Sequence, residues 1–424
     1  MEITLPTIRQ IKPSGTTTKK LPFSHYKQSP DHPNIEDLQN QADALSKDFE
    51  KVQQLPDKLL PRITKQVHSY ITFIKNWFAN KRLDRKGRHD LYPLYLLWTV
   101  TRTCNFRCDY CCDHKGNKYP DLPNKGVLDT NQGKKLLDIM RTNTPAIYYA
   151  GGEPTIRRDL PQLIRHAKNL NYYPQIINTN GSILQNLLKK ESWSNFLADM
   201  DIVIVSLDSL NVDKLDKMYV YNNSTNIIRN ILALRNLRKK YKFKLFINCV
   251  VQPGNIQDAI DVLNWTNDLG ITFVGVPVND GPKARKGIMD DHEYLKFVNT
   301  LLQRHKQGHK FGGSFSMDKK LYNGLPLDCR NTLKPHVDFD GRLSWPCKAC
   351  VNVKPAMVNV LEHKNVDGVW AAGRKLVNPD NFQGGAANQC GANCNWAQNY
   401  STDAYYQGIK NPSLVFRDII NFLK

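Results

Sequence analysis

The chain has 424 residues and a formal net charge of +20 at pH 7, with 59 Lys and Arg residues against 39 Asp and Glu. This length favours two or three domains. No uninterrupted apolar run approaches the ~20 residues of a membrane-spanning helix, which excludes an ordinary integral membrane protein. The first residues lack the basic-then-apolar layout of a secretory signal, so we expect a cytoplasmic protein whose ten cysteines are reduced.

Residues 1–34 are polar and rich in scattered prolines, which predicts an unstructured lead-in. Residues 35–90 carry two helical patterns. In the first, the apolar residues recur at a spacing that places them on one face of a helix. That stripe consists of Leu38, Ala42, Leu45, Phe49 and Val52.

The second helical pattern is both apolar and basic. Its broad apolar face runs from Leu60 to Phe78, and the stretch from Arg62 to Arg88 holds eight Lys and Arg residues against one acid, Asp84. Such a helix can lie on an anionic membrane surface, as a peripheral contact. Because broad apolar faces usually belong to a core, we expect instead that this face packs against the rest of the protein and that the charges are solvated.

Six short apolar runs in residues 91–310 alternate with helical stretches such as Leu160 to Leu170 and Ile227 to Leu237. Their near-continuous Val and Ile content is typical of buried parallel strands. Alternating strands and helices predict an α/β fold with a parallel sheet and right-handed crossovers. The expected strands are Leu96–Val100, Ala146–Ala150, Gln175–Asn178, Ile202–Asp208, Leu245–Val251 and Thr272–Val276.

A loop after the first expected strand carries Cys104, Cys108 and Cys111 in the spacing C-x3-C-x2-C, and the second strand ends in Gly151-Gly152-Glu153-Pro154. Thiolates from one short loop can bind three irons of a 4Fe–4S cube and leave the fourth iron open. Two glycines permit close backbone approach, and a carboxylate suits an ammonium ion. Three cysteines alone would also suit zinc, but zinc does not explain the glycine-rich turn.

Together these features resemble the radical S-adenosylmethionine (SAM) superfamily. The resemblance implies a partial (β/α)6 barrel, with its chemistry at the C-terminal ends of the strands. It implies that the three cysteines hold a 4Fe–4S cluster whose open iron chelates SAM, and that Gly151, Gly152 and Glu153 hold the SAM amino group. It also implies that Tyr110 lies near the adenine.

By the same resemblance, Ser206 and Asn248 are candidates for contacts with the ribose and carboxylate of SAM. Two other cysteines have simpler interpretations. Cys112 directly follows an expected ligand, and we expect it to be a spectator. Cys249 lies inside an apolar strand, where a free thiol behaves as a small hydrophobe.

Residues 311–424 resemble the SPASM and twitch extensions, which hold auxiliary clusters in radical SAM enzymes. A full SPASM domain has seven cysteines, so the five present here favour one auxiliary 4Fe–4S cluster over two. Which of them bind it is open, and a structural zinc site is the alternative. The segment is expected to contain a small hairpin near Gly341, and a strand and a short helix between Ala356 and Trp370. The five cysteines are Cys329, Cys347, Cys350, Cys390 and Cys394.

The implied activity begins with an external reductant, such as flavodoxin or ferredoxin, that reduces the cluster. SAM is then cleaved to methionine and a 5′-deoxyadenosyl radical, which takes a hydrogen atom from a substrate. SPASM-type relatives often modify peptides or mature enzymes, so a peptide or protein is the expected substrate. The sequence does not identify a catalytic residue that quenches the substrate radical.

Other substrates and one other class of function stay open at this point. A small molecule or lipid at a membrane surface is the second candidate. tRNA is the third, because basic chains attract phosphates, although no RNA-binding module is evident. A non-catalytic, metal-stabilised binding protein is the hypothesis from a different class, and the intact cysteine and glycine motifs argue against it.

Overall fold

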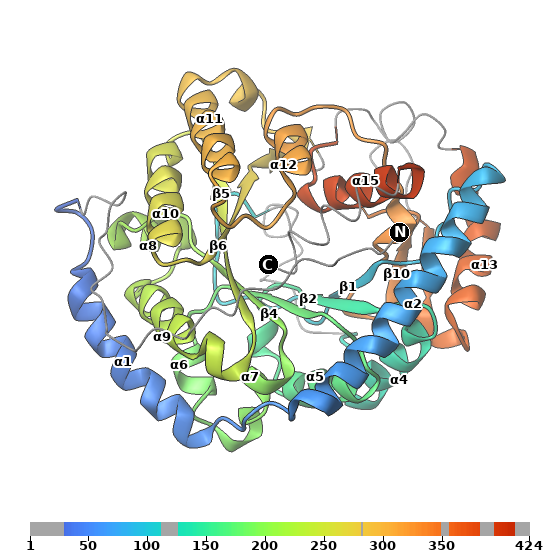
Figure 1. Cartoon of the computed structure of the whole chain (residues 1–424), viewed down its shortest axis with the longest axis horizontal. Coiled ribbons are helices and arrows are strands. Elements are labelled where there is room, and N and C mark those ends of the chain that lie inside the picture. Colours follow the sequence, from blue (N-terminus) through green and yellow to red (C-terminus); the bar gives the residue numbers. More distant parts are fainter. Residues whose placement is uncertain (1–28, 112–125, 281–282, 349–355, 382–393, 412–424) are drawn as a thin grey trace, which may run out of the picture.

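The computed structural model describes residues 29–111, 126–280, 283–348, 356–381 and 394–411 (Figure 1). Within them, nine strands form one mixed sheet, in the order β11 (Ala356–Asn359), β10 (Arg342–Trp345), β9 (His336–Val337), β1, β2, β3, β4, β5 and β6. The six expected strands are all present, parallel to one another and within two residues of their expected bounds. They are β1 (Tyr95–Thr99), β2 (Ala146–Ala150), β3 (Gln175–Thr179), β4 (Ile202–Ser206), β5 (Lys244–Val251) and β6 (Thr272–Pro277).

The two faces of these six strands bury different sets of side chains. Val203, Val205 and Ile247 belong to the large core under the surrounding helices, whereas Ile202, Ile204 and Phe246 form a separate cluster on the inner face. This alternation follows from the period of two along a strand. Figure 1 shows the helices outside the curved sheet. They are α4 (Thr130–Arg141), α5 (Leu160–Asn169), α6 (Leu184–Leu187), α7 (Phe196–Asp199), α8 (Val212–Tyr219), α9 (Thr225–Tyr241) and α10 (Ile256–Asp268).

Helix α1 (Ile35–Val52) buries its stripe as expected. Leu38, Ala42 and Phe49 are buried, and the Ser46 hydroxyl donates to the Ala233 carbonyl of α9 at 3.3 Å. The N-cap is Asn34, whose side chain accepts from the backbone N–H groups at the start of the helix. The helix therefore begins where the chain offers a cap and is held by its apolar side.

Helix α2 (Leu59–Arg85) contradicts the expectation that its apolar face is buried. It packs on the barrel through the opposite side, where Ser69, Asn76 and Asn80 are buried and Trp77 and Leu83 contact the cluster around Leu91. The Asn76 amide donates to the carbonyls of Pro93 and Asn143 at 3.0 and 2.7 Å. Loop carbonyls at the barrel surface need donors, which amides supply and apolar side chains cannot. The apolar face of α2 consequently points to solvent.

The C-terminal segment extends the same sheet. Strand β9 pairs in parallel with β1, and β10 pairs antiparallel with β9 and β11. The hairpin between β9 and β10 turns at Gly341, whose φ of 80° favours glycine. A strand and a helix follow where the sequence predicts them. The bounds are β9 (His336–Val337), β10 (Arg342–Trp345), β11 (Ala356–Asn359) and α13 (Val366–Leu376).

The remaining elements connect the barrel with this segment. None of the helices in the described ranges combines the length and the apolar character that a membrane crossing needs. The helices and strands are β7 (Asn279–Asp280), β8 (Lys283–Ala284), α11 (His292–Lys306), α12 (Phe315–Tyr322) and α15 (Ala397–Lys410). Short 3-10 turns are η1 (Pro154–Ile156), η2 (Glu191–Trp193), η3 (Ile288–Asp290), η4 (Asn331–Leu333), η5 (Val360–Glu362) and η6 (Pro379–Asn381).

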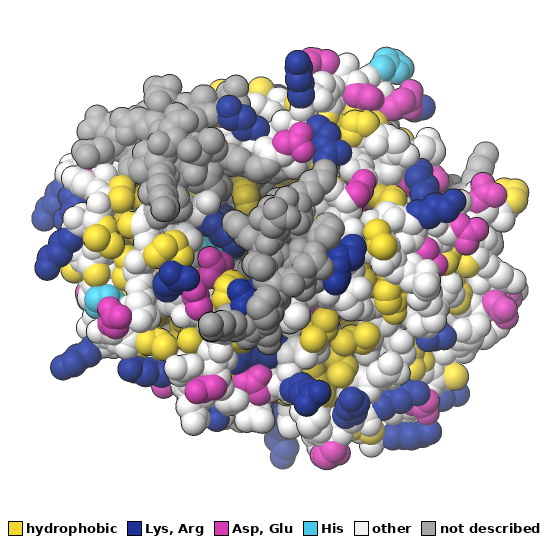
Figure 2. Space-filling model, turned by 180° about the vertical axis from the view of Figure 1, so that it is seen from behind, with side chains coloured by type: hydrophobic (Ala, Val, Ile, Leu, Met, Phe, Trp, Pro, Cys, Tyr) yellow, Lys and Arg dark blue, Asp and Glu magenta, His cyan; other side chains and the backbone are white. Residues whose placement is uncertain are grey.

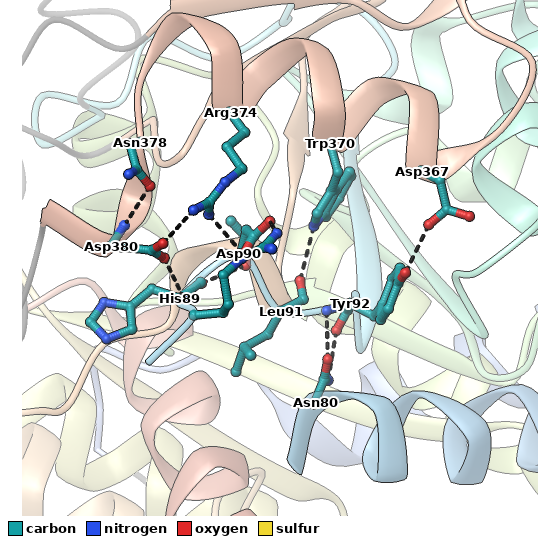
Figure 3. Close-up of polar contacts among 12 residues, drawn as sticks. Asn80, His89, Asp90, Leu91, Tyr92, Asp367, Trp370, Arg374, Asn378 and Asp380 are labelled. Atoms are coloured by element: carbon teal, nitrogen blue, oxygen red, sulfur yellow. Dashed lines mark hydrogen bonds and ion pairs between the residues drawn. The ribbon is translucent and has the colours of Figure 1, made fainter. Parts of the chain in front are cut away.

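The segment before β1 joins α2 to α13, as Figure 3 shows. The Trp370 indole donates to the Leu91 carbonyl at 3.1 Å, and the Tyr92 hydroxyl donates to Asp367 at 2.8 Å. On the other side, Asn80 of α2 exchanges hydrogen bonds with the backbone N–H and carbonyl of Tyr92 at 2.7 and 3.1 Å. The N-terminal helix and the C-terminal segment are thereby fixed on the same part of the barrel.

Candidate functional site

The three cysteines of the C-x3-C-x2-C loop follow β1 at the C-terminal edge of the parallel strands. Cys104, Cys108 and Cys111 form no disulfide and are half-buried. Between the first two, Phe106 is buried and stacks on Tyr219 of α8, with the ring centroids 5.0 Å apart. An apolar side chain therefore anchors the loop while its sulfurs lie nearer the surface.

Burial suppresses ionisation of these thiols. It raises the pKa of Cys104 to about 12 and raises the pKa of Cys108 well above its usual range. The nearby carboxylates of Glu153 and Asp208 and the neighbouring Cys111 add to these shifts. Thiolates at this place need positive charge beside them, which bound iron supplies, and binding would release the protons. The donor set fits the 4Fe–4S cluster that the sequence predicts.

The glycine-rich turn after β2 lies directly against the cysteine loop. The backbone N–H of Gly152 donates to the Thr101 carbonyl at 3.0 Å, and that of Glu153 donates to the Thr103 carbonyl at 2.8 Å. A Cβ on Gly152 would lie 2.2 Å from the Thr103 oxygen, and one on Gly151 would lie 2.4 Å from the Thr101 oxygen. Only glycine permits this approach of two backbones.

The Glu153 carboxylate is 1% exposed and is bonded to its own chain. Its Oε1 accepts from the Thr155 N–H, the Thr155 hydroxyl and the Thr179 hydroxyl at 2.9, 2.5 and 2.7 Å, and its Oε2 accepts from the Asn180 N–H at 2.6 Å. Burial raises the pKa of Glu153, and these hydrogen bonds oppose the shift. The side chain therefore braces the turn against the end of β3.

The end of β3 also holds the cysteine loop. The Asn180 amide donates to Asn105 Oδ1 at 2.8 Å, and the Asn105 amide donates to the Ser182 hydroxyl at 2.9 Å. Asn105 lies directly after Cys104 in the sequence. The loop is therefore tied to the strand ends of both β2 and β3.

Ser206 and Asn248 lie opposite each other on β4 and β5. Both are half-buried and share the inner face with Ile204 and Phe246. Asn178 of β3 lies on the same face, and its buried Oδ1 has no hydrogen-bond partner among the described residues. Ser206, Asn248 and Asn178 thus form a polar row at the C-terminal edge of the strands. Ile204 and Phe246 form an apolar floor below this row. The arrangement suits a polar ligand that enters from the C-terminal edge.

Tyr110 is tied to a buried acid at the end of β4. Its hydroxyl donates to Asp208 Oδ2, and the Val250 N–H donates to Asp208 Oδ1 at 2.7 Å. Asp208 is fully buried, and burial raises its pKa to about 6. The Tyr219 hydroxyl accepts from the Asp208 N–H at 3.1 Å. This arrangement fixes Tyr110 beside the loop that carries the cysteines.

Three of the five C-terminal cysteines come from separate segments. Cys329 precedes η4, Cys347 follows β10, and Cys394 precedes α15. Burial first, and then the neighbouring Cys347 and Cys394, raise the pKa of Cys329. The described thiols are therefore close enough to influence one another. Cys350 and Cys390, like Cys112 of the first loop, lie outside the described residues.

A buried lysine accompanies these thiols. Lys334 is 8% exposed, and its ammonium donates to Asn399 Oδ1 at 2.9 Å. The Asn399 amide in turn donates to Cys394 Sγ at 3.3 Å. Burial lowers the pKa of Lys334, and thiolate charge on the three cysteines opposes that shift. A cationic side chain beside several thiolates is suited to a cluster that carries negative charge.

Within the described ranges, no three His, Cys, Asp or Glu side chains are arranged to share a single metal ion. A 4Fe–4S cube is different from a single ion, because each thiolate binds a separate iron. A cavity of about 580 Å³ lies beside the cysteine loop, between Thr101 and Thr103 on one side and Arg157 and Arg158 on the other. Its lining includes neither the three cysteines nor Ser206, Asn248 and Asn178.

Sequence reasoning missed the side chains that hold this site together. Thr155, Thr179 and Asn180 satisfy Glu153, and Asp208 anchors Tyr110. The one available signal was Asp208, an acid at the end of an otherwise apolar strand. Cys249 is fully buried in β5, as expected for a small hydrophobe.

The comparisons with known proteins agree with this geometry. Residues 98–266 match the model of the Radical SAM superfamily. The chain is 31% identical over 188 residues to molybdenum cofactor biosynthesis protein 1 of Drosophila melanogaster, which covers 44% of this chain and 31% of that protein. It is 25% identical over 296 residues to a probable GTP 3′,8-cyclase of Saccharolobus islandicus. That match covers 66% of this chain and 89% of the cyclase.

The match to the first curated relatives spans about a third of their length. Among solved structures, the fold resembles that of Streptococcus suis SuiB bound to S-adenosylmethionine, with a TM-score of 0.52 and 18% identity over 68% of this chain and 67% of that one. The matched region contains the end of β1, the strands β2 to β5, the cysteine loop and the glycine-rich turn. Over residues 98–266, the chain is therefore similar to the radical SAM superfamily of iron–sulfur enzymes.

Proposed function

We propose that this chain cleaves SAM reductively at a 4Fe–4S cluster on Cys104, Cys108 and Cys111 and uses the resulting 5′-deoxyadenosyl radical to take a hydrogen atom from a substrate. The observation that carries the proposal is the direct contact between the cysteine loop and the glycine-rich turn, at the strand ends where the polar row begins. Bound there, the cluster supplies one electron to SAM.

The chain's own residues would bind and orient SAM. We assign the SAM amino group to the backbone of Gly151 and Gly152, because the Glu153 carboxylate already accepts from four donors of its own chain. Ser206 and Asn248 would contact the ribose and carboxylate, and Tyr110 would border the adenine. The apolar floor below them would exclude water from a reactive radical.

SAM binding can be tested separately from turnover. Addition of SAM to the reduced protein is expected to change the electron paramagnetic resonance spectrum of the cluster. Asn248→Ala should raise the Kd for SAM about tenfold or more, since one charge-assisted hydrogen bond is lost. Asn236→Ala, which removes an exposed amide bonded to Asp43 on the outer surface, is the control. Equal affinities for the two variants would refute the assignment.

For the substrate, we propose a peptide or protein. Support comes from the C-terminal thiols, because Cys347 and Cys394 are near enough to Cys329 to raise its pKa. An SuiB structure of the same fold is described as bound to a precursor peptide. The auxiliary cluster would then contact the substrate or accept the electron of the substrate radical.

A small molecule is the second candidate, because relatives that match most of their own length are named probable GTP 3′,8-cyclases. Nucleic acid is less favoured, because cations on the face shown in Figure 2 are interspersed with acids. A cell-extract fraction that stimulates 5′-deoxyadenosine formation can separate the three. Loss of stimulation after protease treatment supports a peptide, loss after nuclease supports RNA, and stimulation by GTP alone supports a nucleotide.

A further inference from the structure

The apolar face of α2 is a continuous exposed stripe. Its residues are spaced by three or four positions, or lie next to each other, so they share one side of the helix. Their side chains are 42–75% exposed, and Leu60, Ile74 and Phe78 are more than half exposed. Contiguous exposed apolar surface of this kind marks a binding face. The stripe consists of Leu60, Ile63, Val67, Tyr70, Ile71, Ile74 and Phe78.

The outward orientation of this stripe is fixed by buried hydrogen bonds on the opposite side. The Ser69 hydroxyl donates to the Pro145 carbonyl at 2.9 Å, and Asn76 and Asn80 bond to the carbonyls of Pro93 and Tyr92. Rolling the helix to bury its apolar side would leave these carbonyls unpaired. The hydrogen bonds that pack α2 on the barrel therefore keep its apolar stripe exposed.

Cations border and continue the stripe. Lys81 and Arg85 lie three and seven residues after Phe78, on the same side, and Lys75 and Arg82 lie along one edge. Asp84 is the acid of the helix, and its carboxylate accepts from the Tyr406 hydroxyl of α15. A second copy of the chain would bring like charges face to face, whereas a surface of anionic headgroups would complement them.

Aromatic side chains lie in and beside the stripe, where Phe78 is exposed and Trp77 also packs against the buried cluster that contains Leu91. Trp77 and Phe78 lie with ring centroids 5.0 Å apart, and the Lys81 ammonium lies 5.2 Å from the Trp77 centroid. Amphipathic aromatic rings next to cations are favoured at the boundary between headgroups and acyl chains. This combination distinguishes the face from an ordinary solvated helix.

We propose that α2 binds the surface of an anionic lipid bilayer, with its apolar stripe among the outer acyl chains and Lys75, Lys81, Arg82 and Arg85 against the headgroups. The helix lies in the plane of the membrane and does not cross it. The enzyme is then held at the membrane surface by the face of α2 opposite the barrel.

Flotation of the full-length protein with lipid vesicles tests this directly. Vesicles of phosphatidylcholine alone are compared with vesicles that contain an equal share of phosphatidylglycerol. The wild type should float with the second and not with the first. Ile74→Ser/Phe78→Ser should lower the partition coefficient about tenfold or more, because two inserted hydrocarbon side chains are lost. Leu295→Ser/Leu376→Ser removes two leucines that are 42% and 60% exposed elsewhere and should bind like the wild type.

Both double variants keep the net charge, so the net charge of +20 cannot explain a difference between them. Unchanged flotation of the α2 variant, or no flotation of the wild type, would overturn the proposal. Light scattering on the same samples tests self-association, and a dimer that the α2 substitutions dissociate would make the stripe a contact between copies. The assay contains no SAM or reductant, so its outcome is independent of the proposed activity.

Discussion

Replacing Gly152 by alanine should displace the cysteine loop. The added Cβ would lie 2.2 Å from the Thr103 oxygen and 2.8 Å from the Arg102 oxygen, whereas ordinary contact begins at 3.4 Å. Both are backbone atoms that cannot rotate away, so the loop must retreat by 3.4 − 2.2 = 1.2 Å. That movement breaks the 2.8 Å hydrogen bond from Glu153 N–H to Thr103 and strains the 3.0 Å bond from Gly152 to Thr101.

We expect Gly152→Ala to lower the free energy of unfolding by about 2–4 kcal/mol, the sum of overpacking and one or two weakened hydrogen bonds. Urea denaturation of the iron-free protein measures this, and calorimetric titration of the reconstituted protein should show SAM affinity at least about tenfold weaker. Gly368→Ala is the control, because its Cβ would meet nothing closer than 3.5 Å. Wild-type stability and affinity in Gly152→Ala would refute the reasoning.

Three further outcomes follow from single contacts. Because burial raises the pKa of Asp208 to about 6 from 3.8, the folded protein keeps a proton that the unfolded chain releases. The stabilisation that Asp208 gives the iron-free protein should therefore fall by about 3 kcal/mol as pH rises from about 3 to about 7, and Asp208→Asn should remove that contribution in urea titrations. Asn80→Ala should cost about 2–4 kcal/mol in thermal or urea denaturation, since both backbone groups of Tyr92 lose their partner, whereas exposed Ile74→Ala should change stability by less than about 0.5 kcal/mol. Cys347→Ser should lower the iron content from about eight to about four per chain, and an unchanged iron count would exclude Cys347 as a cluster ligand.

The strands and the loop that carries three cysteines were predictable because their signals are local. Six apolar runs give six strands, and the C-x3-C-x2-C spacing reports three thiols on one loop whatever surrounds them. The glycine-rich turn was informative for the same reason, since a pair of adjacent glycines indicates close approach even when the partner is unknown. Here the partner is the backbone of Thr101 and Thr103.

The orientation of α2 and the bracing of the site were not predictable, because they depend on contacts between distant segments. Periodicity shows that Ile74 and Phe78 share one face of α2, but it does not show which face of the helix packs against the barrel. Asn76 decides that through the carbonyl of Asn143, far along the chain. Likewise, Glu153 belongs to a motif that suggests ligand binding. Only the fold reveals that its carboxylate accepts a hydrogen bond from the Thr179 hydroxyl.

The central claim is most directly tested by 5′-deoxyadenosine formation from SAM by anaerobically reconstituted, dithionite-reduced protein, measured with and without the stimulating extract fraction. We predict that the nucleoside and methionine form in equal amounts in the wild type, and that neither forms in Cys108→Ser, which removes one ligand of the loop. A wild-type protein that carries its full iron and binds SAM, yet forms no nucleoside under either condition, would contradict the account.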